Sequence, residues 1–273
     1  MKTKITGGVL LVIALLFFSA ADYLFFKYLR YEHRVNLLPD LSPVPSGPVH
    51  AAIVCNELNF REKKWIHRVN SIERLKIMSE KYSGMEMDIM YDTLKNSFEV
   101  YHPPEKPSGF RLDDVLSNTR NVKAHYFWLD FKNLGKNTNS SSCSKLLELA
   151  KKYDISRNII VESSNAEALK IFTDSGFYTS YYIPVFDLDS LSQEETEFYY
   201  KEVNSHLENT SVCALSANYQ QLPFIEKYFP DKDELIWYLN EDRGLKYQAS
   251  FFFLTRKEKV KVILVSERST GYK

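Results

Sequence analysis

Strand-like and helix-like segments alternate along most of this chain, and the alternation limits the folds that it can adopt. Short apolar runs, bounded by turn residues, predict strands. These runs are Trp65–Val69, Met85–Tyr91, Phe98–Tyr101, Tyr126–Phe131, Asn158–Glu162, Tyr178–Ile183, Val212–Ser216, Leu235–Leu239 and Val260–Val265. Between them lie the predicted helices, Ile72–Tyr82, Leu112–Asn118, Lys145–Tyr153, Ala166–Ser175, Gln193–Leu207 and Pro223–Tyr228. Strands that alternate with helices indicate a mostly parallel sheet.

The number of predicted strands favours a closed barrel. We set Phe98–Tyr101 aside as a hairpin return, which leaves eight strands. Eight strands in about 220 residues fit a compact (β/α)8 TIM barrel. A doubly wound open sheet is the structural alternative. The chain of 273 residues suits one large α/β domain or two small ones, and its 18 Tyr and 18 Phe can build a sizeable core.

Two helix starts carry recognisable capping residues. Asn70 and Glu73 stand at the spacing of a capping box before the first predicted helix. Asn165 is a candidate N-cap for the helix that follows it, and Gly176 stands where a left-handed C-cap residue is expected. These residues therefore predict where two of the helices begin or end.

The N-terminus has the character of a membrane signal. Lys2 and Lys4 precede an apolar run over residues 5–18, and Ser-Ala-Ala at 19–21 would serve as a cleavage site. The apolar character resumes afterwards, so residues 5–26 could span a bilayer of about 30 Å. We favour an uncleaved membrane anchor, with a secreted protein after signal cleavage as the alternative. Both interpretations place the rest of the chain outside the cytoplasm.

The chain divides into three predicted regions. Residues 1–35 form the signal or anchor segment. Residues 36–49 hold four prolines and predict an extended linker. Residues 50–273 then form the barrel domain.

Composition excludes some partners. The chain has no net formal charge, whereas binding to a nucleic-acid backbone needs a basic excess. It also lacks a basic block with interleaved aromatics and a glycine-rich loop that could cradle phosphates. Nucleic acid is therefore not an expected partner.

The chain has three cysteines, Cys55, Cys143 and Cys213, without CxxC spacing. An odd number of this kind argues against a zinc knot or a full disulfide framework. Buried free thiols are the favoured interpretation, and one bridge in an oxidising compartment is the alternative.

Three carboxylates predict a metal site. Strand side chains alternate, so Glu86 and Asp88 share one face of their strand. Asp130 lies at the end of the next barrel strand. Three carboxylates can supply half of an octahedral shell for a hard cation such as Mg²⁺ or Ca²⁺. The alternative is a pair of salt-bridged or solvated acids without a cation.

Histidines and basic residues flank these acids. His67 and His102 are the candidates for acid and base catalysis, because an imidazole titrates near neutral pH. Arg68 could bind a phosphate through its planar guanidinium, and Lys132 could offset phosphate charge. For Lys132 the alternative is simple pairing with Asp130 or Glu86.

Two further polar residues are candidates for the pocket. Asn70 could reach a ligand or a metal, although helix capping is its favoured role. Glu162 follows the next apolar strand and could line the same pocket, but an acid after a strand is also common at helix starts.

The order His67-Arg68, Glu86-x-Asp88, His102 resembles the signature of glycerophosphodiester phosphodiesterases, which are TIM barrels of the phosphatidylinositol-phospholipase-C-like (PLC-like) type. In that family the two histidines act as acid and base, and the Glu-x-Asp carboxylates hold a divalent metal. The resemblance implies these roles for the same residues here, with phosphate binding by Arg68.

The resemblance extends to the next strand. Asp130 stands where these enzymes, or the related sphingomyelinase D group, carry a third acidic ligand, and Lys132 fits the lysine that follows it. A phosphodiesterase of this kind would act on glycerophosphodiesters or related lipid head-group phosphodiesters. A small-molecule or lipid-derived phosphodiester is therefore the expected partner.

A second resemblance is to the menorin family, whose members have a His-x-x-Asn-Ser, a His-Pro-Pro and a Leu-Asp-Phe-Lys element in this order. Residues 67–71, 101–104 and 129–132 match these elements. The prolines after His102 depart from the usual phosphodiesterase, where an Asp commonly follows this histidine. The departure weakens the prediction of a glycerophosphodiester substrate more than that of the barrel.

Three functions are consistent with these features. The first is a membrane-tethered, metal-dependent phosphodiester hydrolase outside the cytoplasm. The second is a non-catalytic, menorin-like barrel that serves ligand binding or adhesion at a membrane surface. The third is a structural ion-pair network with no affinity for cations. The motifs favour the hydrolase.

Overall fold

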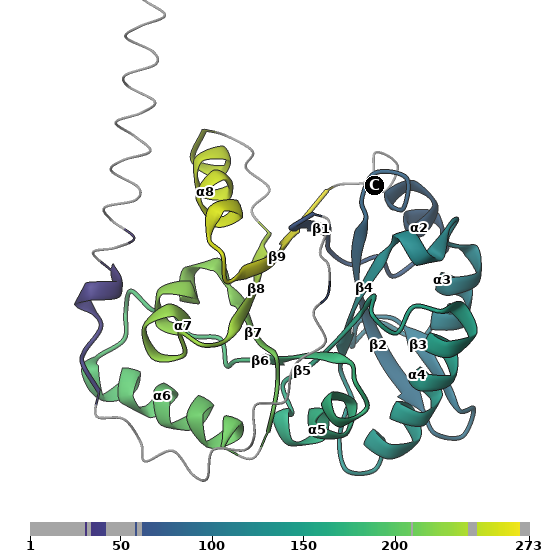
Figure 1. Cartoon of the computed structure of the whole chain (residues 1–273), viewed down its shortest axis with the longest axis horizontal. Helices are drawn as coiled ribbons and strands as arrows, with labels where there is room; N and C mark the ends of the chain where they lie inside the picture. Colours follow the sequence, from purple (N-terminus) through teal and green to yellow (C-terminus); the bar gives the residue numbers. More distant parts are fainter. Residues whose placement is uncertain are drawn as a thin grey trace, which may run out of the picture.

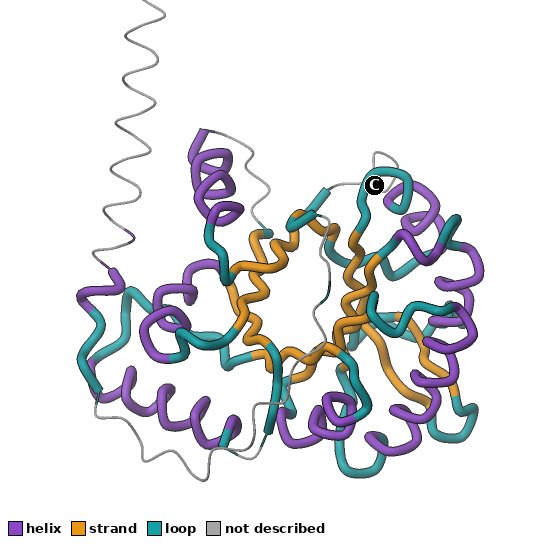
Figure 2. The backbone as a smooth tube through the Cα atoms, viewed as in Figure 1, coloured by secondary structure: helices purple, strands orange, loops and turns teal. Residues whose placement is uncertain are grey.

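Eight parallel strands close into a ring (Figures 1 and 2). The computed structural model describes residues 31, 34–41, 58, 62–208, 210–239 and 245–267. The barrel strands are β1 (Lys64–Ile66), β2 (Gly84–Asp92), β4 (Tyr126–Phe131), β5 (Ile159–Ser163), β6 (Tyr178–Tyr182), β7 (Ala214–Asn218), β8 (Asp233–Tyr238) and β9 (Val260–Val265). Each strand pairs with the next around the ring, and a pairing between β1 and β2 closes it. The (β/α)8 barrel is therefore confirmed over the open-sheet alternative.

The remaining strand, β3 (Ser97–Val100), is the predicted hairpin return. It pairs antiparallel with the outer end of β2, with Ile89 opposite Val100 and Tyr91 opposite Phe98. The chain turns between the two strands at Asn96, whose φ of 50° is left-handed. An asparagine tolerates this conformation better than most residues.

Helices lie outside the ring of strands (Figure 2). They are α2 (Ile72–Met78), α3 (Leu112–Asn118), α4 (Asn139–Tyr153), α5 (Ala166–Asp174), α6 (Gln193–Leu207), α7 (Leu222–Tyr228) and α8 (Leu245–Arg256). Short 3-10 helices occur at Val122–Ala124 and Tyr219–Gln221.

The sequence prediction missed α8 and the first turns of α4. α4 begins with a serine-rich stretch, in which Ser142 and Cys143 face the core. Serines compete with the helix for backbone hydrogen bonds, so they conceal a helix start in the sequence.

The helix caps follow the predictions in one case and not in the other. Asn165 caps α5 by accepting a hydrogen bond from the N–H of Ala168, and Gly176 has a φ of 89° beyond its end. At α2, however, the N-cap is Ser71, whose hydroxyl accepts from the N–H of Arg74. The prediction that Asn70 caps this helix is therefore wrong.

Two apolar layers hold the barrel together. The larger layer lies between the strands and the helices outside them, and a separate outer cluster of this layer covers β8 and β9. The smaller layer fills the lower interior of the barrel and includes Trp65 and Trp128. Gly84 makes room for the Trp65 ring, because a Cβ at this position would lie 2.1 Å from it. A glycine at the start of β2 thus permits the largest interior side chain.

Residues 34–41 run along the outside of the barrel, against α7. The hydroxyl of Tyr228 donates to the carbonyl of Pro39 at 2.8 Å, and Lys227 forms an ion pair with Asp40 at 2.8 Å. The predicted anchor over residues 5–26 lies outside the described residues, and no helix within the described ranges is long and apolar enough to cross a membrane. The division into three regions stays a prediction.

The cysteines differ from one another. Cys143 is a buried free thiol, as predicted. Cys213, at the start of β7, is disulfide-bonded, so the prediction of a free thiol is wrong there. The alternative from the sequence, a single disulfide bond, therefore applies to Cys213.

Candidate functional site

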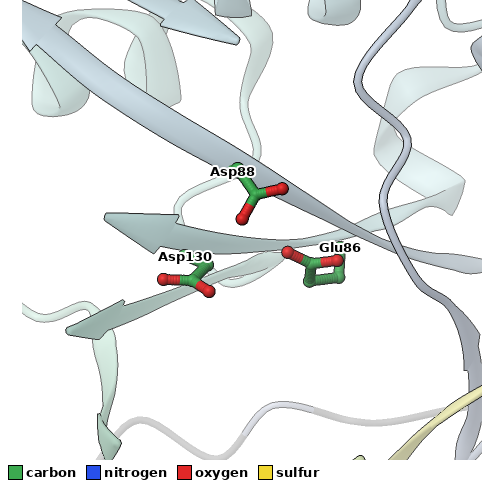
Figure 3. Close-up of side chains that lie close together, drawn as sticks. All are labelled: Glu86, Asp88 and Asp130. Carbon is green, nitrogen blue, oxygen red and sulfur yellow. The ribbon is translucent and has the colours of Figure 1, made fainter. Parts of the chain in front are cut away.

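Three carboxylates enter the barrel from the neighbouring strands β2 and β4. Alternation turns Glu86 and Asp88 inward, and Asp130 is the register partner of Asp88. One oxygen from each carboxylate lies within 4.8 Å of the others. Glu86 and Asp88 are 2% and 1% exposed. Figure 3 shows the three groups turned toward one another, which brings together the acids predicted to hold a metal.

Two cationic side chains contact this cluster. Lys132 donates to Asp130, and its Nζ also lies 2.9 Å from Oδ1 of Asp88. The Nε of Arg68 lies 3.7 Å from Oδ2 of Asp88, and its side chain is 45% exposed. Lys132 thus pairs with Asp130, as its alternative role predicted, while Arg68 can reach outward to a ligand.

The backbone of Arg68 holds Glu86 in place. Its N–H donates to Oε2 of Glu86 at 2.7 Å. Arg68 has a φ of 58°, a left-handed conformation that costs a non-glycine residue on the order of 1–3 kcal/mol. The other oxygen of Glu86, Oε1, is buried without a hydrogen-bond partner among the described residues. The segment after β1 thus holds one oxygen of Glu86, and the other oxygen faces the barrel interior without a partner among the described residues.

Burial and repulsion from neighbouring acids raise the pKa values of Glu86 and Asp130. The pKa of Glu86 is raised well above its usual range by burial, and the charges of Asp88 and Asp130 raise it further. Burial also raises the pKa of Asp130, although Lys132 opposes the shift. Burial works to lower the pKa of Lys132, but Asp130 and Asp88 outweigh it and raise that pKa.

The donor set fits a hard divalent cation. Carboxylate oxygens are the ligands that Mg²⁺ and Ca²⁺ prefer in proteins, and three of them converge here. The orphaned Oε1 of Glu86 has nothing else to bind within the described part of the chain. A bound cation would also offset the repulsion that raises the pKa values of Glu86 and Asp130.

His67 lies beside Glu86 at the end of β1. Its Nε2 is 3.7 Å from Oε2 of Glu86. Burial lowers the pKa of His67 to about 4, although Asp88 opposes the shift. The imidazole is therefore neutral near pH 7 and can accept a proton.

His102 reaches the site from the segment that follows β3. The N–H of Tyr101 donates to the backbone carbonyl of Asp88 at 3.1 Å, which ties this segment to β2. A charge on His102 lowers the pKa of Asp130, so the two side chains lie near enough to interact. The segments that carry the two histidines thus lie along the same edge of β2, because the N–H of Val69, after β1, donates to the carbonyl of Glu86 on that edge.

Asn70 supports Asp88 instead of capping a helix. Its Nδ2 donates to Oδ2 of Asp88 at 2.6 Å, and its Oδ1 accepts from the N–H of Asp88 at 3.1 Å. The amide therefore fixes both the backbone and the carboxylate of Asp88. The His-x-x-Asn spacing was the only sequence signal of this contact.

Glu162 lies inside the barrel next to the cluster. It is the register partner of Asp130 on β5 and is 1% exposed. Burial and then Asp130 raise its pKa well above the usual range. Ser180 and Ser216, on β6 and β7, are also fully buried inside, and sequence reasoning missed both because serine carries no pattern of its own.

Aromatic side chains line the barrel interior near the acidic cluster. The rings of Tyr182 and Trp237 meet edge to face, with centroids 4.4 Å apart. Trp237 packs on the interior cluster, whereas Tyr219 packs against Tyr238 in an outer one. Tyr182 and Trp237 thus lie together at the barrel interior, and Tyr219 lies elsewhere.

Comparison with known proteins gives structural matches only. No family model matches the chain, and no curated protein matches its sequence. The glycerophosphodiester phosphodiesterase of Parabacteroides distasonis superposes with a TM-score of 0.50 at 16% identity, over 75% of this chain and 92% of its own. The enzyme of the same name from Thermotoga maritima gives 0.51 at 14% identity, over 74% and 93%.

A phosphodiesterase of Oleispira antarctica, solved in complex with the product sn-glycerol-3-phosphate, is similar to the same extent. Its TM-score is 0.50 at 12% identity, over 75% of this chain and 92% of its own. The resemblance to the menorin family stays a prediction. At these identities the likeness concerns the fold, so this chain has the barrel fold found in glycerophosphodiester phosphodiesterases.

Proposed function

We propose that this barrel is a metal-assisted phosphodiester hydrolase that acts on glycerophosphodiesters or related head-group diesters. The convergence of Glu86, Asp88 and Asp130 within 4.8 Å carries the proposal. Active sites of such barrels lie at the carboxyl ends of the strands, where Asp130 and the two histidines stand. The shared fold with glycerophosphodiester phosphodiesterases supports the same assignment.

The three carboxylates would hold one Mg²⁺ or Ca²⁺. When bound, such a cation polarises the phosphoryl oxygens of a diester. Arg68 is half-exposed beside Asp88, so its guanidinium can donate to two phosphate oxygens in a bidentate manner. Lys132 neutralises the acids and stabilises the negative charge that develops on the phosphate.

The two histidines act as the base and the acid of the reaction. Burial keeps His67 neutral, so its free imidazole nitrogen accepts the proton of the attacking water. His102, in the segment that follows β3, donates a proton to the departing alkoxide. If the alcohol that stays esterified to the phosphate carries a neighbouring hydroxyl, that hydroxyl can give its proton to His67 and attack the phosphorus in place of water. The other ester bond then breaks, its alkoxide takes the proton of His102, and a cyclic phosphate results.

We also propose that the protein is anchored to a membrane, with the barrel outside the cytoplasm. The apolar run over residues 5–26 motivates the anchor. The disulfide at Cys213 supports an oxidising compartment, because such bonds persist there. Protease protection of the full chain in sealed vesicles tests this topology, and a barrel digested only from the cytoplasmic side contradicts it.

Turnover of a phosphodiester panel tests the hydrolase. The purified full chain is incubated with glycerophosphodiesters and lysophospholipids in Mg²⁺ or Ca²⁺, and the products are identified. We expect release of a phosphomonoester, with His102→Ala lowering kcat by at least about 100-fold. The matched control is His206→Ala, because the ring of His206 packs at a tilt against Tyr181, away from the acids. Cation binding without any turnover would favour the non-catalytic module.

A further inference from the structure

Glu162 has a buried carboxylate that the proposed reaction does not use. It stands on β5 as the direct neighbour of Asp130, with Ser180 as its neighbour on β6. Its Oε2 is buried without a hydrogen-bond partner among the described residues. A buried carboxylate oxygen in this state costs on the order of 1–3 kcal/mol or more, so something in the working protein satisfies it.

Other polar atoms around Glu162 are also buried. Trp128 Nε1, Ser180 Oγ and Ser216 Oγ are each buried without a well-formed hydrogen bond among the described residues. Ser216 and Trp128 nevertheless lie close enough to Glu162 to lower the pKa of its carboxyl as hydrogen-bond donors. The three residues come from β4 and β6, which flank β5, and from β7, the next strand beyond β6. The opposite wall of the interior carries Leu235 and Val262 and is apolar. The unsatisfied polar atoms are therefore confined to one sector of the barrel, next to the acids.

The chemistry of these atoms selects water as their partner. An indole N–H only donates, a carboxyl oxygen without a proton only accepts, and a serine hydroxyl does both. Water can serve all of them, and buried water typically makes about three hydrogen bonds of this kind. An anion is excluded because Asp130 and Glu162 are neighbours on adjacent strands.

We propose that Glu162 is a positioning residue of the cation site, which it reaches through ordered water held by Ser180, Ser216 and Trp128. Glu162 is not one of the three acids whose oxygens converge within 4.8 Å, so it contacts the hydration shell of the cation instead of the ion. This inference rests on the proposed function, since it requires a cation at Glu86, Asp88 and Asp130.

A contact between Glu162 and the hydration shell affects which cation the site prefers. Mg²⁺ gives up its waters reluctantly and keeps several of them when bound, whereas Ca²⁺ accepts more protein ligands. A carboxylate that binds the hydration shell therefore favours Mg²⁺ more than Ca²⁺. Loss of Glu162 should shift the preference of the site toward Ca²⁺.

Calorimetric titration of the metal-stripped full chain with Mg²⁺ and with Ca²⁺ tests the proposal. We expect Glu162→Gln to weaken Mg²⁺ binding by about 10-fold or more, and to weaken Ca²⁺ binding less. The matched control is Glu234→Gln, because Glu234 is equally buried, has an Oε2 without a partner in the described part of the chain, and lies at the far end of β8. The control should change neither affinity by more than about twofold.

Two outcomes overturn the proposal. Unchanged Mg²⁺ affinity in a folded Glu162→Gln, while Asp88→Asn abolishes binding, refutes the role of Glu162 and leaves the proposed function standing. Absence of cation binding by the unaltered chain refutes both. If Glu162→Gln does not fold, Ser216→Ala replaces it, because it removes one anchor of the water and should lower Mg²⁺ affinity more than Ca²⁺ affinity.

Discussion

Asp88 receives more contacts than any other member of the acidic cluster. Asn70 binds its carboxylate and its N–H, Lys132 pairs with its Oδ1, and Arg68 approaches its Oδ2. Strand alternation predicted that Asp88 would share a face with Glu86. The contact with Asn70 could not be predicted in the same way, because Asn70 stands one residue before the true cap and capping is the commoner role of asparagine there.

Asn70→Ala should lower both stability and cation affinity. The change leaves the buried N–H of Asp88 without a partner and frees its carboxylate to turn, so we expect the free energy of unfolding to fall by about 1–3 kcal/mol. Urea denaturation measures this change. Asn204→Ala is the control, because the amide of Asn204 binds Glu208 on the exposed side of α6 and its loss should cost under about 0.5 kcal/mol. Equal losses in both variants would contradict the role of Asn70.

The elements show which parts of the fold follow from local pattern. Each predicted barrel strand overlaps an observed one, because apolar runs bounded by turn residues report burial directly. α8 was not predicted, because Phe251, Phe252 and Phe253 are consecutive and do not show the three-to-four-residue spacing of apolar residues that indicates a helix. The closing pair of β1 and β2 also could not be read from the sequence, since it joins segments through the geometry of the whole ring.

Gly84→Ala tests the fit between β1 and β2. The added Cβ would meet the Trp65 ring at 2.1 Å, and Trp65 is enclosed inside the barrel. We expect the free energy of unfolding to fall by about 1–3 kcal/mol. Gly135→Ala is the matched control, because nothing lies within 4 Å of its added Cβ. A Gly84 variant as stable as this control would show that the Trp65 ring is free to move aside.

At the scale of the whole molecule, the barrel separates its charged groups. The acids proposed to bind a cation lie toward the carboxyl ends of the strands, and Glu234 lies at the opposite end of β8 among Glu226, Lys257 and Lys259. Burial raises the pKa of Glu234 to about 8, and Glu226 adds to this shift. The sequence predicted the first group from its spacing. It did not reveal the second, because the chain brings those residues together only on folding.

The pH dependence of stability follows from Glu234. The folded chain keeps this proton up to about pH 8, whereas the unfolded chain releases it near pH 4.5. The folded state therefore binds more protons in this window, and the free energy of unfolding falls as the pH rises through it. Glu234→Gln stays neutral, so its unfolding free energy should fall less between about pH 5 and about pH 9. Parallel curves for the two proteins would contradict the shifted pKa.

Restoring metal to the metal-stripped full chain, with hydrolysis of a glycerophosphodiester as the readout, tests the central claim most directly. We expect no phosphomonoester before addition, release on adding Mg²⁺ or Ca²⁺, and at least about a 100-fold loss in Glu86→Gln. Glu234→Gln, the same change at the other end of the barrel, should retain activity. Equal turnover by Glu86→Gln and the unaltered chain, or turnover that chelation does not reduce, would contradict the claim.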